Sequence, residues 1–303
     1  MLRLERVTKV YKVGTFGGTS LRAVDDVSFD LRAGEIVSLI GESGSGKSTI
    51  GRMVLRLARV SSGVITFDGS DISTLRGGST KAYYGEVQGV FQDPFSSYNP
   101  VFKVDRVFTM IRDGYFRGIG TGEWHDKLHG ALGVVGLTPG EVLGRYPHQL
   151  SGGQLQRLLI ARALLLDIRL LVADEVISML DASTRIDVLN VLADLKQRGL
   201  GILFITHDLS LGNYISDRTL ILRHGRVVEV GPTQKVLGDP RHSYTRALLA
   251  SVPQLHRKWG DEELVASVAG NGTPALPGDP GADGLLAVGD GHFVAPEPEA
   301  GPS

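Results

Sequence analysis

Residues Gly41–Thr49 read GESGSGKST, and this stretch decides the fold of the chain. It follows a short apolar run, Glu35–Ile40, and precedes a segment with helical character, Ile50–Leu57. The sequence G-x-x-x-x-G-K-[ST] between a strand and a helix is typical of a phosphate-binding loop. Glycines let consecutive backbone N–H groups face phosphate oxygens, and the helix N-terminus behind them favours an anion. We therefore predict that the chain binds a nucleoside triphosphate here.

The residue types in this loop predict separate roles. Lys47 is expected to reach the β- and γ-phosphates, and Ser48 is expected to place its hydroxyl on Mg²⁺. The alternative is a flexible Gly/Ser turn with an exposed lysine, which the flanking strand and helix make the weaker interpretation. The other residues expected to surround the phosphates are Gly41, Glu42, Ser43, Gly44, Ser45, Gly46 and Thr49.

The composition of the 303 residues is that of a soluble globular protein, with 42% hydrophobic and 21% charged residues. The net charge of −1 gives no indication of a nucleic-acid partner. The absence of cysteine excludes disulfides and cysteine-ligated metal sites. No signal peptide is expected at the N-terminus, and no apolar run reaches the roughly 18 residues of a membrane span. Any role at a membrane must therefore come through a partner.

Strands and helices alternate along the chain after the phosphate loop, which favours a mostly parallel α/β core. We predict a phosphate-loop NTPase core with an N-terminal antiparallel β part and a helical subdomain. His224-Gly225 is the expected turn of a hairpin between strands 219–223 and 226–229. The other expected strands are 2–11, 24–31, 64–67, 86–91, 169–173 and 201–205, and the main expected helices are 151–166, 182–198 and 208–215.

The same pattern suggests three parts. Residues 1–231 are the predicted nucleotide-binding domain, with its helical subdomain at about 101–166, and residues 232–268 form a C-terminal extension. Residues 269–303 contain eight Gly, six Pro, five acidic residues and no Lys or Arg. Because such a segment buries too little apolar surface to offset its ordering entropy, we expect it to be disordered.

An acidic pair, Asp174-Glu175, follows the apolar strand 169–173. A buried strand that ends in Asp is how phosphate-loop enzymes hold Mg²⁺, and the next carboxylate can polarise the attacking water. Taken alone, the pair would more simply be acidic residues at a helix start. Together with the phosphate loop, the interpretation as Mg²⁺ ligand and catalytic base is preferred.

A second anion-binding surface is predicted at Leu150-Ser151-Gly152-Gly153-Gln154, where a serine and two glycines open a long helix. This string resembles the signature motif of ABC-type ATPases. The resemblance implies that two cassettes pack head to tail, so that the signature of one closes on the γ-phosphate held by the loop of the other.

Four further residues match conserved-motif positions of that family, in the order along the chain that the family shows. The resemblance implies that Tyr11 stacks on adenine, that Gln92 contacts Mg²⁺ and the attacking water, and that His207 contacts the γ-phosphate. It places Asp181 in the loop that crosses the dimer interface. The simpler alternatives are a core aromatic residue for Tyr11 and a structural histidine for His207.

Two longer stretches resemble the ATPases of peptide/nickel (dipeptide/oligopeptide) importers. Residues 91–100, FQDPFSSYNP, resemble VFQDP-x-SSLNP, and residues 239–249, DPRHSYTRALL, resemble NP-x-HPYT-x-x-LL with Ser243 in place of proline. Residues 51–57 look more like the second ATPase subunit of those importers. The resemblance implies a second ABC ATPase subunit, a paralogue, with two transmembrane permeases and an extracytoplasmic solute-binding protein, at the cytoplasmic face of the membrane.

One stretch departs from the family pattern, since 174–181 read DEVISMLD where DEPTSALD is common. Asp174 and Glu175 are present, so hydrolysis is expected to survive while coupling between the two nucleotide sites could differ. Two alternatives stay open: a soluble non-transport ABC ATPase, and a catalytically weak regulatory cassette paired with an active one. The cargo, whether peptide, metal chelate or oligosaccharide, is not encoded in an ATPase subunit.

Overall fold

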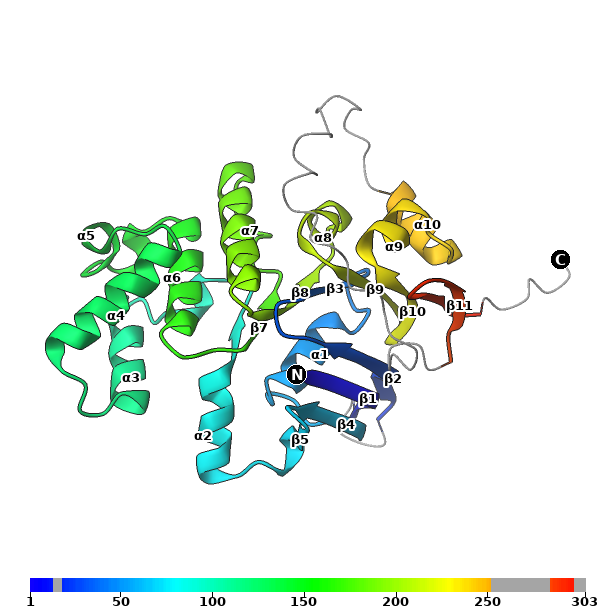
Figure 1. Cartoon of the computed structure of the whole chain (residues 1–303), viewed down its shortest axis with the longest axis horizontal. Helices are drawn as coiled ribbons and strands as arrows, with labels where there is room; N and C mark the ends of the chain where they lie inside the picture. The colour runs from blue at the N-terminus through cyan, green and yellow to red at the C-terminus, as the bar shows by residue number, and fades with distance from the viewer. Residues whose placement is uncertain (13–17, 252–283, 297–303) are drawn as a thin grey trace, which may run out of the picture. The chain divides into compact units, whose positions relative to one another are not determined.

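The computed structural model describes residues 1–12, 18–251 and 284–296 (Figure 1). These residues form two compact units, which we describe one at a time. Unit 1 comprises the described residues within Met1–Leu75 and Gly201–Ser303, and unit 2 comprises Arg76–Leu200.

The centre of unit 1 is strand β3 (Ile36–Ile40), which pairs in parallel with β8 (Gly201–Thr206) and β9 (Arg218–Arg223). Every residue of β3 and β8 is buried, as expected where a parallel sheet is covered on both faces. Helix α1 (Lys47–Val54) follows β3 after the phosphate loop. The other helices of this unit are the 3₁₀ turn η1 (Ile72–Thr74), α8 (Leu209–Ile215), α9 (Thr233–Gly238) and α10 (Ser243–Ala250).

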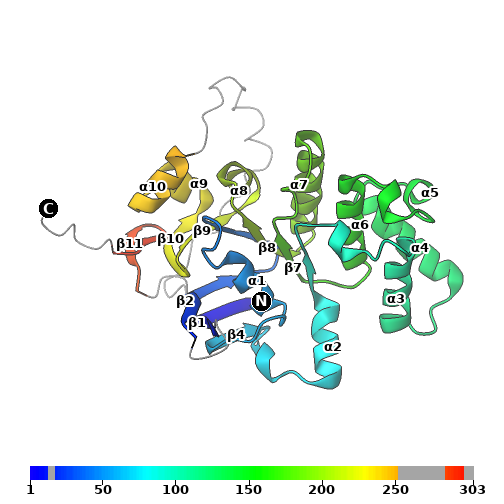
Figure 2. The same cartoon turned by 180° about the vertical axis from the view of Figure 1, so that it is seen from behind.

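A second sheet of unit 1 is antiparallel, in the order β2-β1-β4-β5. Figures 1 and 2 both show it beside α1. It confirms the predicted N-terminal antiparallel part, although β2 and β4 begin earlier than expected and β5 was not predicted. The bounds are β1 Leu2–Lys12, β2 Ser20–Leu31, β4 Ser62–Phe67 and β5 Ser70–Asp71.

The predicted hairpin turn is confirmed between β9 and β10 (Arg226–Pro232). His224 and Gly225 both have positive φ, 48° and 82°. Two successive left-handed residues characterise the type I′ turn, whose twist matches that of the flanking strands.

The expectation of disorder is wrong for part of the C-terminal segment. Residues 286–289 (β11) and 292–294 (β12) form a hairpin, and β12 pairs with β10 in the register Glu229↔Val294 and Val230↔Phe293. Composition averages over a segment and cannot detect an open strand edge elsewhere in the chain, which a short strand can complete. The remaining parts of 269–303, namely 269–283 and 297–303, lie outside the described residues.

The buried carboxylate of Glu229 links the β11–β12 hairpin to the sheet through His292. Glu229 of β10 is fully buried, and its Oε1 lies 2.7 Å from Nε2 of His292 in β12. The backbone N–H groups of Arg241 and His242 donate to the same carboxylate at 2.8 and 3.1 Å. Burial by itself raises the pKa of Glu229, but the hydrogen bonds from His292, Arg241 and His242 outweigh it and lower that pKa below its usual value of 4.5. Glu229 is therefore ionised in the folded protein at neutral pH.

Glu229→Gln is expected to lower the free energy of unfolding by about 2 kcal/mol at pH 7, because a neutral amide replaces an acceptor of several hydrogen bonds. Since the folded-state pKa lies below 4.5, this contribution is complete above about pH 5 and disappears as the pH falls through the folded-state pKa. Urea unfolding of both proteins from pH 7 to pH 4 should show the difference shrinking at the acid end. Glu123→Gln, at an exposed position, is the control, and a constant difference across this range would contradict the assignment.

Unit 2 combines a parallel pair, β6 (Val87–Val90) and β7 (Leu170–Asp174), with helices. Helices α3, α4, α5 and α6 all lie within the predicted helical subdomain, whereas α2 was not predicted. Among the described residues, no helix is both long and apolar enough to cross a membrane. The helices are α2 Gly77–Glu86, α3 Asp105–Tyr115, α4 Thr121–Val134, α5 Pro139–Val142, α6 Gly152–Leu164 and α7 Ala182–Gln197, with 3₁₀ turns η2 Phe95–Ser97 and η3 Pro147–Gln149.

Candidate functional site

The phosphate loop of unit 1 leaves the carboxyl end of β3 and enters α1, as predicted. The loop residues Glu42, Ser43 and Gly44 are exposed, whereas Ser45 and Gly46 behind them are buried. The loop therefore presents its middle to solvent and is supported on its inner side.

Two other parts of unit 1 support the inner side of the loop. The N–H of Gly225, in the β9–β10 turn, donates to the carbonyl of Ser45 at 3.0 Å, and the N–H of Asp25 in β2 donates to the carbonyl of Gly225 at 2.8 Å. Gly46 has φ 106°, and a Cβ there would lie 2.4 Å from the carbonyl oxygen of Ala23 in β2. Only glycine fits this position, because the backbone of β2 occupies the space of a side chain.

Lys47 folds back over its own loop. Its Nζ donates to the carbonyl oxygens of Gly41 at 2.7 Å and Glu42 at 2.8 Å, and to Oγ of Ser45 at 3.3 Å. These three acceptors are neutral oxygens around a buried ammonium. A phosphate oxygen would be a stronger acceptor for this cation, so the arrangement fits a triphosphate.

His207 directly follows strand β8. The parallel register pairs Ile40 with Thr206, so Gly41 and His207 follow at neighbouring carboxyl ends of β3 and β8. His207 is exposed. Tyr11 is half-buried near the end of β1, opposite Leu21 of β2, and Lys9 lies 4.7 Å from the centre of its ring. Unit 1 thus brings His207 to the start of the phosphate loop, while Tyr11 belongs to the second sheet.

Unit 2 brings the predicted acidic pair and the glutamine together. The register Val90↔Ala173 of β6 and β7 makes Gln92 and Asp174-Glu175 follow at adjacent carboxyl ends. Asp174 is buried and Gln92 is exposed. Glu175 adopts φ 49°, a left-handed conformation that costs a non-glycine residue about 1–3 kcal/mol and is concentrated at functional sites. Its carbonyl accepts hydrogen bonds from N–H and Oγ of Ser178 at 3.1 and 2.9 Å, which hold this turn.

The signature string begins α6 with reciprocal hydrogen bonds. Oγ of Ser151 accepts from the N–H of Gln154 at 3.1 Å, and Oε1 of Gln154 accepts from the N–H of Ser151 at 2.9 Å. A Cβ at Gly153 would lie 2.3 Å from Cγ2 of Thr184 in α7, so glycine permits close contact between the two helix starts. Ser151 is exposed and Gly152 half-buried, and the helix N-terminus behind them can receive an anion.

Asp181 begins α7 as its N-cap. Its carboxylate accepts from Oγ of Ser183 at 2.6 Å and from the N–H and Oγ1 of Thr184 at 3.0 and 2.9 Å. These hydrogen bonds place the pKa of Asp181 well below its usual range. The side chain predicted to lie at a dimer interface is thus an ionised helix cap within this chain.

Of the three residues that depart from the family pattern, two are buried and one is exposed. Val176 and Ile177 are both buried at 2% exposure, whereas Met179 is exposed at 60%. Two buried apolar residues thus stand in place of the usual Pro-Thr, next to the left-handed turn at Glu175. Asp174 and Glu175 keep their positions at the end of β7.

One contact to the loop was missed by the sequence reasoning. The N–H of Glu42 donates to the hydroxyl of Tyr244, in α10, at 3.2 Å. Tyr244 belongs to the quoted stretch 239–249, which had served only to indicate a subfamily. No sequence signal connects it with a loop some two hundred positions earlier.

The strand–loop–helix arrangement of unit 1, with a buried lysine in the loop, is that of a phosphate-loop nucleotide-binding protein. Residues 24–178 match the family model described as ABC transporter, and residues 228–276 match that described as oligopeptide/dipeptide transporter, C-terminal region. The chain belongs to the ABC transporter family, and it carries the C-terminal region of the oligopeptide/dipeptide transporters. The subfamily resemblance of 239–249 is thereby confirmed.

Relatives and solved structures agree with this assignment. The chain is 45% identical over 236 residues to a putative peptide import ATP-binding protein of Brucella ovis, covering 77% of this chain and 74% of the relative. It is 40% identical over 286 residues to the glutathione import ATP-binding protein GsiA of Salmonella typhimurium, covering 91% of this chain and 44% of GsiA.

The fold also resembles solved ATP-binding cassettes. The dimeric structure of a post-hydrolysis state of the ATP-binding cassette MJ0796, bound to ADP and Pi, has a TM-score of 0.69 and 28% identity, and covers 77% of this chain and 99% of that one. The structure of cbiO1 from Clostridium perfringens, with a TM-score of 0.67 and 24% identity over 83% of this chain and 95% of that one, shows the same fold. The predicted α/β cassette is confirmed.

Proposed function

We propose that this cassette hydrolyses ATP to energise import of peptides, or related solutes such as oligosaccharides, through partner permeases. The observation that carries the proposal is the phosphate loop, in which the buried Lys47 donates to three loop oxygens, with His207 at the neighbouring strand end. The import names of the relatives and the match to the oligopeptide/dipeptide C-terminal region support the direction of transport and the class of cargo.

The site residues divide the chemistry of phosphoryl transfer among them. Lys47 would bind the β- and γ-phosphates, and Glu175 would orient and polarise the attacking water. The hydroxyl of Ser48, the amide of Gln92 and the carboxylate of Asp174 are oxygen ligands of the kind that Mg²⁺ prefers, so the residues present fit this ion. When bound, Mg²⁺ neutralises charge on the phosphate oxygens.

The remaining site residues would contact the adenine base and the γ-phosphate. Tyr11 would stack on adenine and His207 would donate to the γ-phosphate. Ser151–Gln154 would act on the nucleotide held by a second cassette, which we propose to be a paralogue. The N–H groups at the start of α6 provide the positive end of a helix dipole for that contact.

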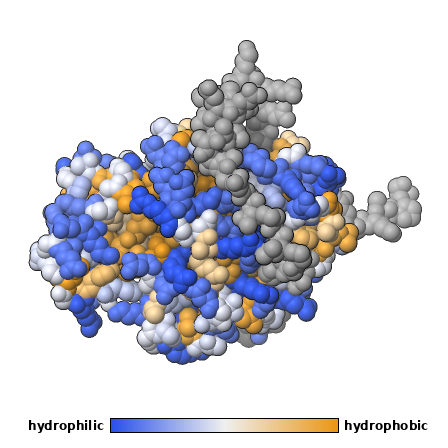
Figure 3. Space-filling view, viewed as in Figure 1, coloured by the Kyte–Doolittle hydropathy of each residue, from blue (hydrophilic) through white to orange (hydrophobic). Residues whose placement is uncertain are grey.

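The partners we propose are two transmembrane permeases and an extracytoplasmic solute-binding protein, which would place the cassette at the cytoplasmic face of the membrane. Large apolar side chains are exposed in the stretch that follows Gln92 and in α3: Phe95 (49%), Val101 (73%), Phe102 (39%) and Met110 (64%). Figure 3 shows apolar surface exposed over the helices of unit 2. Such side chains suit a permease helix, which would connect nucleotide-driven closure to transport.

The test is ATP hydrolysis by the complex reassembled in liposomes with its permeases, with and without the solute-binding protein loaded with peptides. Lys47→Ala is expected to reduce turnover by about a hundred-fold or more, because a charge that stabilises the transferring phosphate is lost. Lys127→Ala, which removes a lysine near the ring of Phe116, is the control. A wild-type complex that hydrolyses ATP without any response to a loaded binding protein would contradict the import function.

A further inference from the structure

The peptide group between Gly41 and Glu42 is held on both of its sides. Its carbonyl, that of Gly41, accepts from the Lys47 ammonium at 2.7 Å, and its N–H, that of Glu42, donates to the Tyr244 hydroxyl at 3.2 Å. In a trans peptide these two groups point in opposite directions. The two hydrogen bonds therefore fix the orientation of this peptide plane at the start of the phosphate loop.

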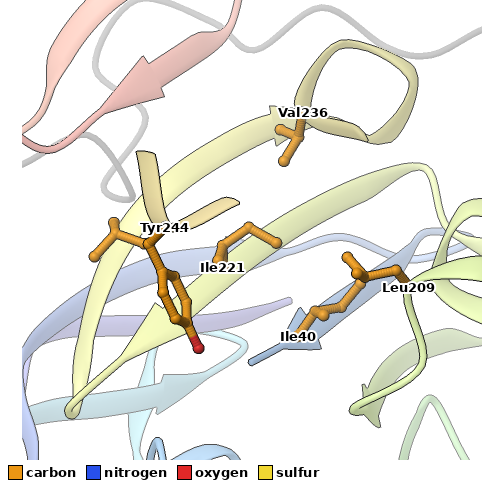
Figure 4. Close-up of a cluster of buried hydrophobic side chains, with 6 residues drawn as sticks. Ile40, Leu209, Ile221, Val236 and Tyr244 are labelled. Atoms are coloured by element: carbon orange, nitrogen blue, oxygen red, sulfur yellow. The ribbon is translucent and has the colours of Figure 1, made fainter. Parts of the chain in front are cut away.

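Tyr244 is itself held firmly. It comes from α10, is 8% exposed, and packs in an apolar cluster with Ile40, Ile221 and Val236. Figure 4 shows its ring beside Ile221, with the hydroxyl directed away from the helix that carries it. The Arg223 guanidinium lies 5.0 Å from the ring centre. Burial raises the pKa of Tyr244, so the phenol is neutral at physiological pH.

The start of α10 is tied to the C-terminal hairpin through the carboxylate described above. His242 caps α10, because its Nδ1 accepts from the N–H of Tyr244 at 3.0 Å. The N–H of His242 in turn donates to Glu229, which also contacts His292 of β12. Successive hydrogen bonds therefore link the hairpin to Glu229, Glu229 to His242, His242 to Tyr244, and Tyr244 to Glu42.

We propose that Tyr244 is a positioning residue through which the C-terminal extension holds the phosphate loop in the shape that receives a nucleoside triphosphate. The inference rests on the proposed function and adds to it that the extension acts on nucleotide affinity. A loop already ordered loses less conformational freedom when the ligand binds, so its affinity is higher. Tyr244 touches neither phosphate nor water in this scheme and acts through the Gly41–Glu42 peptide.

Tyr244→Phe in the full-length protein tests the inference, because it keeps the ring and removes only the hydroxyl acceptor. We expect the dissociation constant for MgATP, measured by titration calorimetry, to rise about three- to ten-fold, the usual effect of losing one hydrogen bond. In the assembled complex the KM for ATP should rise by the same factor with kcat nearly unchanged. Tyr115→Phe is the matched control, since the Tyr115 hydroxyl also makes one hydrogen bond, to the carbonyl of Lys81 at 3.4 Å.

His292→Phe tests the contribution of the hairpin, because it keeps an aromatic ring but removes the nitrogen that faces Glu229. We expect weaker MgATP binding in the same direction as Tyr244→Phe and by no larger factor, with thermal unfolding measured to verify that the variant is folded. A folded His292→Phe protein that binds MgATP with wild-type affinity would show that the hairpin does not contribute to nucleotide binding.

Failure of the inference and failure of the proposed function give different results. A Tyr244→Phe protein that binds MgATP as tightly as the wild type and the Tyr115→Phe control would overturn the inference. A reduced kcat with unchanged KM would overturn it too, because a positioning role in binding predicts the opposite. A wild-type protein that does not bind MgATP at all would instead overturn the proposed function.

Discussion

Glu175→Gln is expected to bind MgATP and to hydrolyse it at least about a hundred-fold more slowly than the wild type. The amide has nearly the same shape as the carboxylate but cannot polarise the attacking water. Glu175 directly follows β7 and has a left-handed backbone conformation. Strands β6 and β7 are parallel neighbours, so Gln92, which follows β6, comes at the adjacent strand end. Because binding depends on other residues, two nucleotide-loaded cassettes should accumulate in the closed arrangement.

Phosphate release by the assembled complex measures turnover, and size-exclusion chromatography with MgATP measures closure. Glu123→Gln, which changes an exposed carboxylate in the first turn of α4, is the control. Near-normal turnover in Glu175→Gln would remove Glu175 from the role of catalytic base. Little turnover in the wild type itself, next to an active partner subunit, would favour the regulatory cassette that the sequence left open.

Gly46→Ala is expected to lower the free energy of unfolding by about 3 kcal/mol or more, even without nucleotide. Two separate effects destabilise the folded protein when alanine replaces this glycine. Its φ of 106° is unfavourable for a residue with a Cβ, and that Cβ would lie 2.4 Å from the carbonyl oxygen of Ala23. The contact is with backbone of β2, which cannot move aside as a flexible side chain can. We also expect MgATP binding to be lost, because Lys47 and α1 follow directly.

Gly44→Ala separates the two effects. Gly44 also has a positive φ, 82°, but a Cβ there would meet no atom within 4 Å. Its free energy of unfolding is therefore expected to fall by only about 1 kcal/mol, the usual cost of alanine at positive φ. Urea unfolding of the three proteins without nucleotide is the measurement. Equal losses for both variants would show that the contact with Ala23 contributes nothing.

The sequence alone determined those parts of the protein whose signals are local. The run Glu35–Ile40, the loop Gly41–Thr49 and the helix behind it are contiguous, so their order and residue types are sufficient to predict a phosphate loop. The His224-Gly225 turn was predicted for the same reason, since two adjacent turn residues between two strand-like runs signal a hairpin. The resemblance of Leu150–Gln154 to a family signature also lies in one short string.

Only the tertiary structure decided the features that join distant parts of the chain. The hydrogen bond between Glu42 and Tyr244 spans 202 positions, and that between Glu229 and His292 spans 63. A Gly- and Pro-rich segment has no pattern that predicts a strand, yet the open edge of β10 and the buried carboxylate of Glu229 supply partners for one. Such contacts depend on the complementarity of two surfaces, which exists only once the chain has folded.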